Sequence, residues 1–176
     1  MVVRADMASE RAKTFLGRNR DRIAVTPNQL HAAAVQAGDD TAVTINQVCE
    51  RAGIRVLKQP PGAASFKVGD TLAIGAVSAV ISRRGALKAR QILQVLGDAK
   101  LAPVPASLIR AVEELLVNKE YSVQIDPGDL TTTIRAGLGE AESEAKIFAA
   151  THNIPMWKAL VSVLFKRCKR GRRRAA

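Results

Sequence analysis

The segment LIRAVEELL, residues 108–116, decides the fold class. Its apolar residues are spaced i, i+1, i+4, i+7 and i+8, which places them on one face of a helix; they are Leu108, Ile109, Val112, Leu115 and Leu116. Polar residues occupy the other side. The segment therefore predicts an amphipathic α-helix whose apolar stripe packs against other helices.

The sequence before this segment predicts two more helices. Residues 71–82 are apolar almost all the way round, which is typical of a central buried helix, and Asp70 is a suitable N-cap for it. Gly85 should break the chain, because glycine is a poor helix former. We expect a second helix at 86–96, so these helices and 108–116 would share a core.

Three further helices are expected after residue 116. The stretch Asp126-Pro127-Gly128-Asp129 has acidic residues suited to a helix N-terminus and opens a helix at about 127–137. Another helix should cover 141–152. The last should run from Pro155 to about Lys169, directly into a basic segment.

The residues near Thr26 form a complete helix start signal. Thr26 can act as the N-cap, Pro27 occupies the first helical position, and Gln29 completes a capping box. Val25 and Leu30 are spaced as a hydrophobic staple requires. We therefore predict a helix that starts at Pro27.

Local signals also bound the next helix. Gly38 should end the helix that starts at Pro27, and Asp39 or Asp40 can cap another that runs to about Ala52 and closes at Gly53. Upstream, we expect a helix at 8–19 and a short strand within residues 1–6.

Residues 54–58 and 64–68 flank the turn Gln59-Pro60-Pro61-Gly62 and predict a small β-hairpin near residues 54–68, or an extended wing. The whole pattern predicts a mainly α protein, a compact multi-helix bundle. We divide it into a helical domain over 1–165 and a basic flexible tail over 166–176. A length of 176 residues suits one such domain.

Several function classes find no support in the sequence. No catalytic motif is present, so we expect a non-enzymatic protein without a cofactor. No charge-free stretch is long enough for a membrane span, and charged residues near the start argue against a signal peptide. Cys49 and Cys168 match no metal-ligand spacing, which indicates a reduced, cytoplasmic compartment.

The charge distribution suggests a nucleic-acid partner. The chain carries 27 basic and 16 acidic residues, a net charge of +11, and seven of the basic residues lie in 166–176. Flexible cations bind phosphates and release counterions, so this segment predicts contact with double-stranded DNA. A solvated tail without a partner is the alternative. The basic residues are Lys166, Arg167, Lys169, Arg170, Arg172, Arg173 and Arg174.

A second basic group surrounds the junction at Gly85. It consists of Arg83, Arg84, Lys88 and Arg90, and the i, i+4 spacing of Arg84 and Lys88 predicts that they share one helix face. We consider it as a further phosphate-binding group, with an ordinary solvated face as the favoured alternative.

Other polar residues have structural interpretations. His31 and His152 lack partners at metal spacing, and Cys49 lies on an apolar helix face. Cys168 is flanked by cations that would lower its pKa. The acidic residues look like solvated faces; these are Glu113, Glu114, Glu140, Glu142 and Glu144.

Aromatic residues make up 3% of the chain, which argues against a single-strand stacking platform. Trp157 and Phe165 fall in an apolar helical stripe and are predicted to be core residues. Residues 41–56 have the pattern of the first helix and turn of a helix-turn-helix. The two prolines that follow cannot begin a recognition helix.

The segment GRNRDRIAVTP, residues 17–27, resembles ParB-like proteins. In that family a helix ends in Glu-Asn-x-x-Arg, with an aliphatic residue and a proline soon after. Asn19, Arg22, Val25 and Pro27 match this spacing, and the chain to about residue 118 is similar to the helical region of a ParB-like subgroup. The resemblance implies that Asn19 and Arg22 contact an anion.

The chain departs from that family in two respects. Arg18 replaces the acid before the asparagine, and the phosphate motif of the family's N-terminal domain is absent. The chain thus looks like a ParB-like protein without most of that domain, so nuclease or nucleotidase activity is not expected. An exposed N-terminal apolar face would favour a homo-oligomer. We predict a DNA-binding or partition-related module, with a protein-interaction or structural domain as the alternative.

Overall fold

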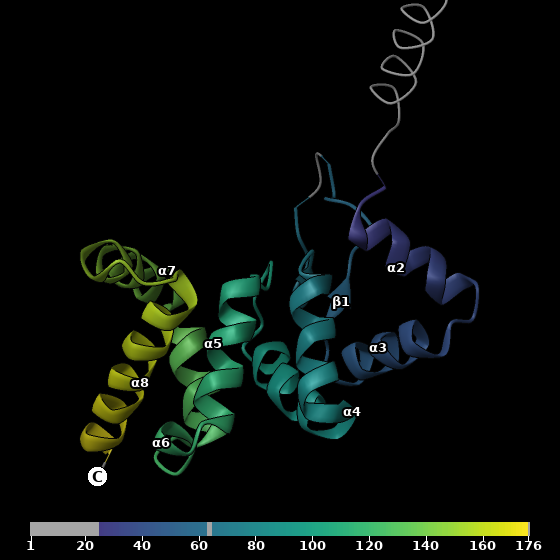
Figure 1. The fold of residues 1–176 in the computed structure, drawn as a ribbon. Helices are drawn as coiled ribbons and strands as arrows, with labels where there is room; N and C mark the ends of the chain where they lie inside the picture. Colours follow the sequence, from purple (N-terminus) through teal and green to yellow (C-terminus); the bar gives the residue numbers. More distant parts are fainter. Residues whose placement is uncertain (1–24, 63–64, 176) are drawn as a thin grey trace, which may run out of the picture.

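The computed structural model describes residues 25–62 and 65–175, and beyond Lys169 it describes the backbone alone (Figure 1). The expected strand at 1–6, the helix at 8–19, Asn19 and Arg22 lie outside the described residues. The described part is mostly helical, with one two-stranded sheet, so the mainly α prediction is confirmed. Its elements are α2 (Pro27–Gln36), α3 (Asp40–Arg51), β1 (Arg55–Val56), β2 (Asp70–Thr71), α4 (Ile74–Asp98), α5 (Ala106–Val117), α6 (Lys119–Ser122), α7 (Pro127–His152) and α8 (Met156–Ala175).

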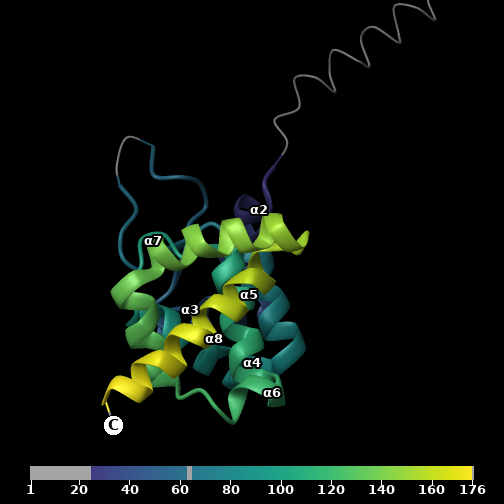
Figure 2. The same ribbon diagram turned by 90° about the vertical axis from the view of Figure 1, so that its left-hand side faces the viewer.

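The helices are arranged in a row, and α7 also reaches back to α4. α3 contacts α2 and α4, α5 lies between α4 and α8, and α8 packs along α7. Figure 1 shows this row from α2 and α3 on the right to α7 and α8 on the left. Figure 2 shows α8 crossing the bundle, with its C-terminal end at the edge of the molecule. The described helices therefore form one continuous body, to which the short α6 is joined through its contacts with α5.

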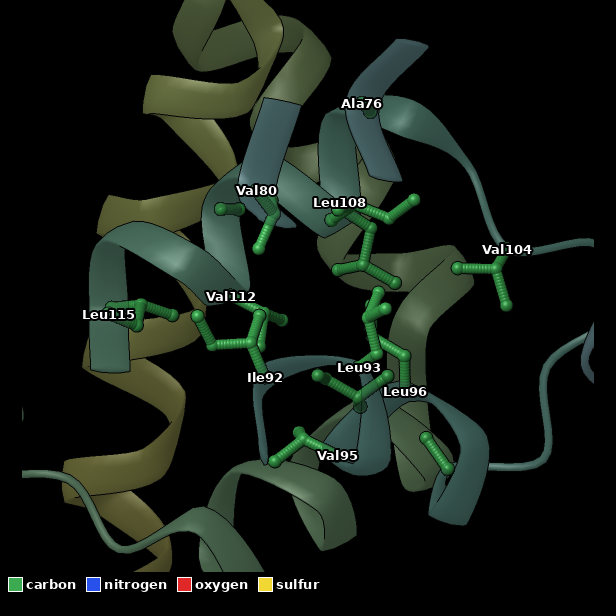
Figure 3. Packing of buried hydrophobic residues seen from close by; sticks show 14 of the residues in the cluster. Ala76, Val80, Ile92, Leu93, Val95, Leu96, Val104, Leu108, Val112 and Leu115 are labelled. Atoms are coloured by element: carbon green, nitrogen blue, oxygen red, sulfur yellow. The ribbon is translucent and has the colours of Figure 1, made fainter. Parts of the chain in front are cut away.

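The predicted stripe on α5 forms the centre of the core. Leu108, Ile109, Val112 and Leu115 are fully buried, and Leu116 is half-buried. Figure 3 shows residues of this stripe facing the second half of α4. The α4 residues that meet the stripe are Ile92, Leu93 and Leu96.

Most predicted helix boundaries are confirmed. The Thr26 hydroxyl accepts from the Gln29 amide at 3.2 Å, and the Thr26 amide donates to the Gln29 side chain at 2.9 Å, which completes the capping box. Asp39 caps α3 through the Ala42 amide at 2.8 Å. Local hydrogen bonds therefore fix these helix starts as the sequence indicates. The predicted staple residues, Val25 and Leu30, are each 58% exposed, so much of both side chains remains in contact with solvent.

Two long helices are broken by glycines where the sequence predicts breaks. Gly85, at φ 72°, interrupts α4, and Gly137 interrupts α7. The positive φ at Gly85 is a conformation that other residues adopt at a cost. Each long helix is thus two shorter ones that meet at an angle.

The predicted β-hairpin is wrong. β1 and β2 pair in parallel, Arg55 with Asp70 and Val56 with Thr71, and β2 lies beyond the expected segment 64–68. Two tight hydrogen bonds hold β2 in place: the Thr71 hydroxyl donates to the Val104 carbonyl at 2.8 Å, and the Val104 amide donates to the Asp70 carbonyl at 2.8 Å. The chain therefore crosses over before it pairs, as parallel strands require.

The predicted cap at Asp70 is also wrong. α4 begins at Ile74, and Asp70 is a buried residue of β2. Its carboxylate accepts from the Arg55 guanidinium at 2.7 Å and from the Lys67 amide at 2.8 Å. A buried carboxylate needs such partners, and they commit Asp70 to the sheet instead of the helix.

Candidate nucleic-acid interface

Two members of the predicted basic group converge on one carboxylate. Arg83 donates from Nε to Glu113 Oε1 at 3.1 Å and from Nη2 to Oε2 at 2.6 Å. Arg84 Nε donates to Glu113 Oε1 at 2.8 Å. Glu113 lies on α5 and is 5% exposed, whereas the side chains of Arg83 and Arg84 are 49% and 33% exposed. The prediction that Glu113 lies on a solvated face is therefore wrong.

The electrostatics of Glu113 follow from this geometry. Burial by itself would raise the pKa of Glu113, because it penalises the charged form. The hydrogen bonds and positive charges of Arg83 and Arg84 outweigh burial and lower the pKa below its ordinary value. Glu113 is therefore ionised at neutral pH and ties α4 to α5.

A pocket of about 330 Å³ adjoins this cluster. Its lining also includes Arg110 and Glu114 from α5 and Trp157 from the first turn of α8. Glu114 accepts a hydrogen bond from Asn118 at 2.8 Å. Sequence reasoning missed Arg110, since a single basic residue on an amphipathic helix carries no distinguishing signal.

The other two members of the basic group lie after the break at Gly85. The non-helical conformation of Gly85 interrupts the helix between Arg84 and Lys88, so the predicted shared face does not form. Lys88 lines a separate cavity of about 680 Å³ between α4 and the start of α7, and Arg90 is exposed. Within the described part of the chain, neither residue forms an ion pair.

The predicted basic tail begins inside the folded body. Arg167 donates to Glu144 at 3.1 Å and to Glu140 at 3.3 Å, both on α7, and its side chain is 27% exposed. Cys168 is buried and contacts the Thr133 hydroxyl at 3.4 Å. The backbone stays helical through Ala175. A tail boundary at residue 166 is therefore too early.

Lys166 and Lys169 are exposed on the same helix. The Lys166 ammonium lies 5.5 Å from the centre of the Phe148 ring, and that of Lys169 lies 4.4 Å from the centre of the Phe165 ring. Neither lysine forms an ion pair with a described residue, and a cation–π contact does not neutralise the charge. The remaining predicted residues continue the α8 backbone, and their side chains are not described; they are Arg170, Arg172, Arg173 and Arg174.

The remaining candidates fit structural roles. Cys49 is buried, and burial together with the charge of Glu50 raises the pKa of its thiol to about 12, as expected of a core residue. The His152 ring packs on Phe148 at 4.2 Å between centroids. Burial lowers the pKa of His31, and its Nε2 has no hydrogen-bond partner among the described residues. No cluster of three or more metal-ligating side chains occurs within the described ranges.

Comparisons with protein-family models, with curated proteins and with solved structures find no match to this chain. The resemblance to ParB-like proteins therefore stays a prediction. Of the residues that carry it, Pro27 is the first residue of α2, and Val25 precedes it on the surface. No helix in the described ranges is long and apolar enough to cross a membrane.

Proposed function

We propose that the chain is a non-enzymatic DNA-binding module, partition-related as its sequence resemblance implies, that contacts duplex DNA through the basic end of α8. The observation that carries the proposal is the continuity of α8. Its first half is buried in the core through Ala159, Leu160 and Leu164, and the same helix backbone continues through the basic segment. The cations are thus presented by an anchored helix.

The charge and shape of this helix end suit DNA. Lys166 and Lys169 are exposed, and four arginines follow without an intervening acid. An α-helix fits the major groove, and cations near a helix C-terminus are favoured by the helix dipole. Arg167 is held by Glu140 and Glu144, which leaves six basic residues in this segment to contact phosphates.

The other basic residues that the sequence predicts as DNA contacts differ in how well they suit that role. Arg83 and Arg84 pair with Glu113 and line a pocket together with Trp157, so we assign them no contact with duplex DNA. Lys88 and Arg90 are free to assist, since both are exposed. Asn19 and Arg22 remain proposed anion contacts on the resemblance alone.

The test is fluorescence anisotropy with labelled duplex DNA between about 50 and 200 mM salt. Six phosphate contacts predict a log–log salt slope of about −5 for the wild-type chain. The variant Lys166→Gln, Lys169→Gln, Arg172→Gln, Arg173→Gln should retain two contacts and a slope of about −2.

A control variant removes the same charge from other exposed sites. It carries Arg51→Gln, Lys58→Gln, Lys119→Gln and Lys146→Gln. Binding by the α8 end predicts that the control keeps most of its affinity and its slope. If both variants weaken equally, affinity comes from net charge alone and the assignment to α8 is wrong.

A protein-interaction domain is the second candidate, and exposed apolar side chains favour it. Leu87 is 83% exposed, Val123 80% and Ile147 71%. Such side chains are common singly on monomer surfaces, but a partner or a second copy could cover them. Sedimentation at increasing concentration tests this candidate: it predicts a rising mass together with no salt-sensitive DNA binding.

A further inference from the structure

The pocket formed by α4, α5 and α8 contains more positive charge than its structural role requires. Arg83 alone reaches both oxygens of Glu113 in a bidentate pair, the strong geometry for a guanidinium and a carboxylate. Arg84 adds a third hydrogen bond to the same carboxylate. Arg110 lines the same pocket and pairs with no acid in the described part of the chain.

The charges of the lining residues leave the pocket net positive. Three arginines face two glutamates, a difference of +1. Glu113 is buried behind Arg83 and Arg84, and Glu114 already accepts from Asn118. Among the described residues, Arg84 is engaged through Nε alone, so its two terminal nitrogens remain as donors. A guanidinium group with free terminal nitrogens binds phosphate oxygens in a defined, often bidentate geometry.

Trp157 adds an aromatic side chain to the pocket, so the ligand can be larger than an inorganic anion. It lines the pocket together with the three arginines and is half-buried, and the Lys158 ammonium lies 5.6 Å from the centre of its ring. A volume of about 330 Å³ lies near the lower end for ligand sites, which fits a small molecule better than a polymer.

We propose that this pocket binds a small phosphate monoester that carries a planar ring, with Arg84 and Arg110 on the phosphate and Trp157 against the ring. The site is separate from the proposed DNA contact. Trp157 lies in the first turn of α8, and Lys166, the first of the proposed DNA-contacting residues on this helix, lies nine residues later, which corresponds to about 14 Å along a helix. The proposal of a ligand pocket therefore does not depend on the proposal that the far end of α8 binds DNA.

The experiment titrates the full chain with phenyl phosphate, inorganic phosphate and phenol. Trp157 is the only tryptophan, so its fluorescence reports directly from the pocket wall. Phosphorus NMR line broadening of the two phosphates supplies a second readout. We expect saturable binding of phenyl phosphate, weaker binding of inorganic phosphate, and none of phenol.

Arg110→Gln is the decisive variant, because Arg110 is exposed and supports no ion pair in the described structure. Loss of one charged donor should weaken phenyl phosphate binding about tenfold or more. Arg51→Gln makes the same substitution on an exposed residue of α3, outside the pocket, and should leave binding unchanged.

Four results would overturn the proposal, three from the ligand titrations and one from DNA binding. The first is no saturable signal in either readout. The second is equal weakening by Arg110→Gln and Arg51→Gln. The third is binding of phenol as strong as that of phenyl phosphate, which would indicate an apolar site. Duplex DNA affinity of Arg110→Gln should match wild type, whether or not the α8 proposal holds; a parallel loss would indicate one shared anion surface and contradict a separate pocket.

Discussion

Two ion-pair clusters in this molecule have opposite compositions. On α4 and α5, one carboxylate, Glu113, is held by two arginines. On α7 and α8, one guanidinium, Arg167, is held by two glutamates. Each cluster joins two neighbouring helices through three charged groups, so they differ mainly in which charge is central and how deeply it lies.

Burial separates the two clusters. Glu113 is 5% exposed, whereas Glu140 and Glu144 have side chains that are 81% and 52% exposed. A buried charge without a partner carries a large desolvation penalty, and an exposed one is solvated by water. Removing a partner is therefore costly only where the charge left behind cannot reach solvent.

The largest expected change in the free energy of unfolding comes from leaving Glu113 without its two arginine partners. Replacing both partners by uncharged side chains of similar length, Arg83→Met with Arg84→Met, keeps Glu113 covered but unpaired and should lower the free energy of unfolding by about 3–5 kcal/mol at pH 7. Urea unfolding followed by Trp157 fluorescence measures the loss. The variant Glu113→Gln removes the carboxylate instead and leaves Arg83 and Arg84 half-exposed, where water solvates them. It should therefore lower the free energy of unfolding by less than the double variant does.

The pH dependence should reverse in the same double variant. In the wild type the pKa of Glu113 is lowered, so its stabilising contribution is present above the ordinary glutamate pKa of about 4.3 and is lost as the pH falls through the lowered value. Without the arginines, burial acts alone and raises the pKa, so protonation relieves the penalty as the pH falls.

The difference in unfolding free energy between wild type and double variant should thus shrink from pH 7 towards pH 4. Measuring both chains at each pH cancels the titration of all other groups. A difference that is constant with pH would mean that lost packing, and not the stranded charge, causes the destabilisation.

The sequence predicted those features that depend on neighbours a few residues away. The stripe on α5, the caps at Thr26 and Asp39, the break at Gly85 and the helix end near residue 137 all rest on local spacing or on local hydrogen bonds. These interactions form wherever the helix forms, so no knowledge of the tertiary fold is needed.

The features that were missed depend on contacts distant in sequence. Asp70 joins Arg55 across 15 positions, and Glu113 joins Arg83 across 30. Gly97 is a further case, because an added Cβ there would lie 1.9 Å from the Ala52 carbonyl oxygen where α4 meets α3. For the candidate interface, the sequence located the basic segments, but only the structure separates Arg83, Arg84 and Arg167, which are paired, from Lys166 and Lys169.

The smallest expected change in the free energy of unfolding comes from the exposed cluster around Arg167. Arg167→Gln strands only glutamates that water already solvates, so the pairing itself should contribute below about 1 kcal/mol. Because a truncated arginine also loses packing of its stem, a double-mutant cycle with Glu144→Gln is needed to isolate the pair.

The cycle should give a coupling free energy of about 0.5 kcal/mol that declines as salt is raised, since exposed charges are screened. The equivalent cycle with Arg83→Gln and Glu113→Gln should give a larger coupling that salt changes little, because Glu113 is shielded from solvent. Equal couplings with equal salt sensitivity would show that burial does not distinguish the two clusters. The stability of the α4–α5 junction would then need a cause other than the pairing of Glu113.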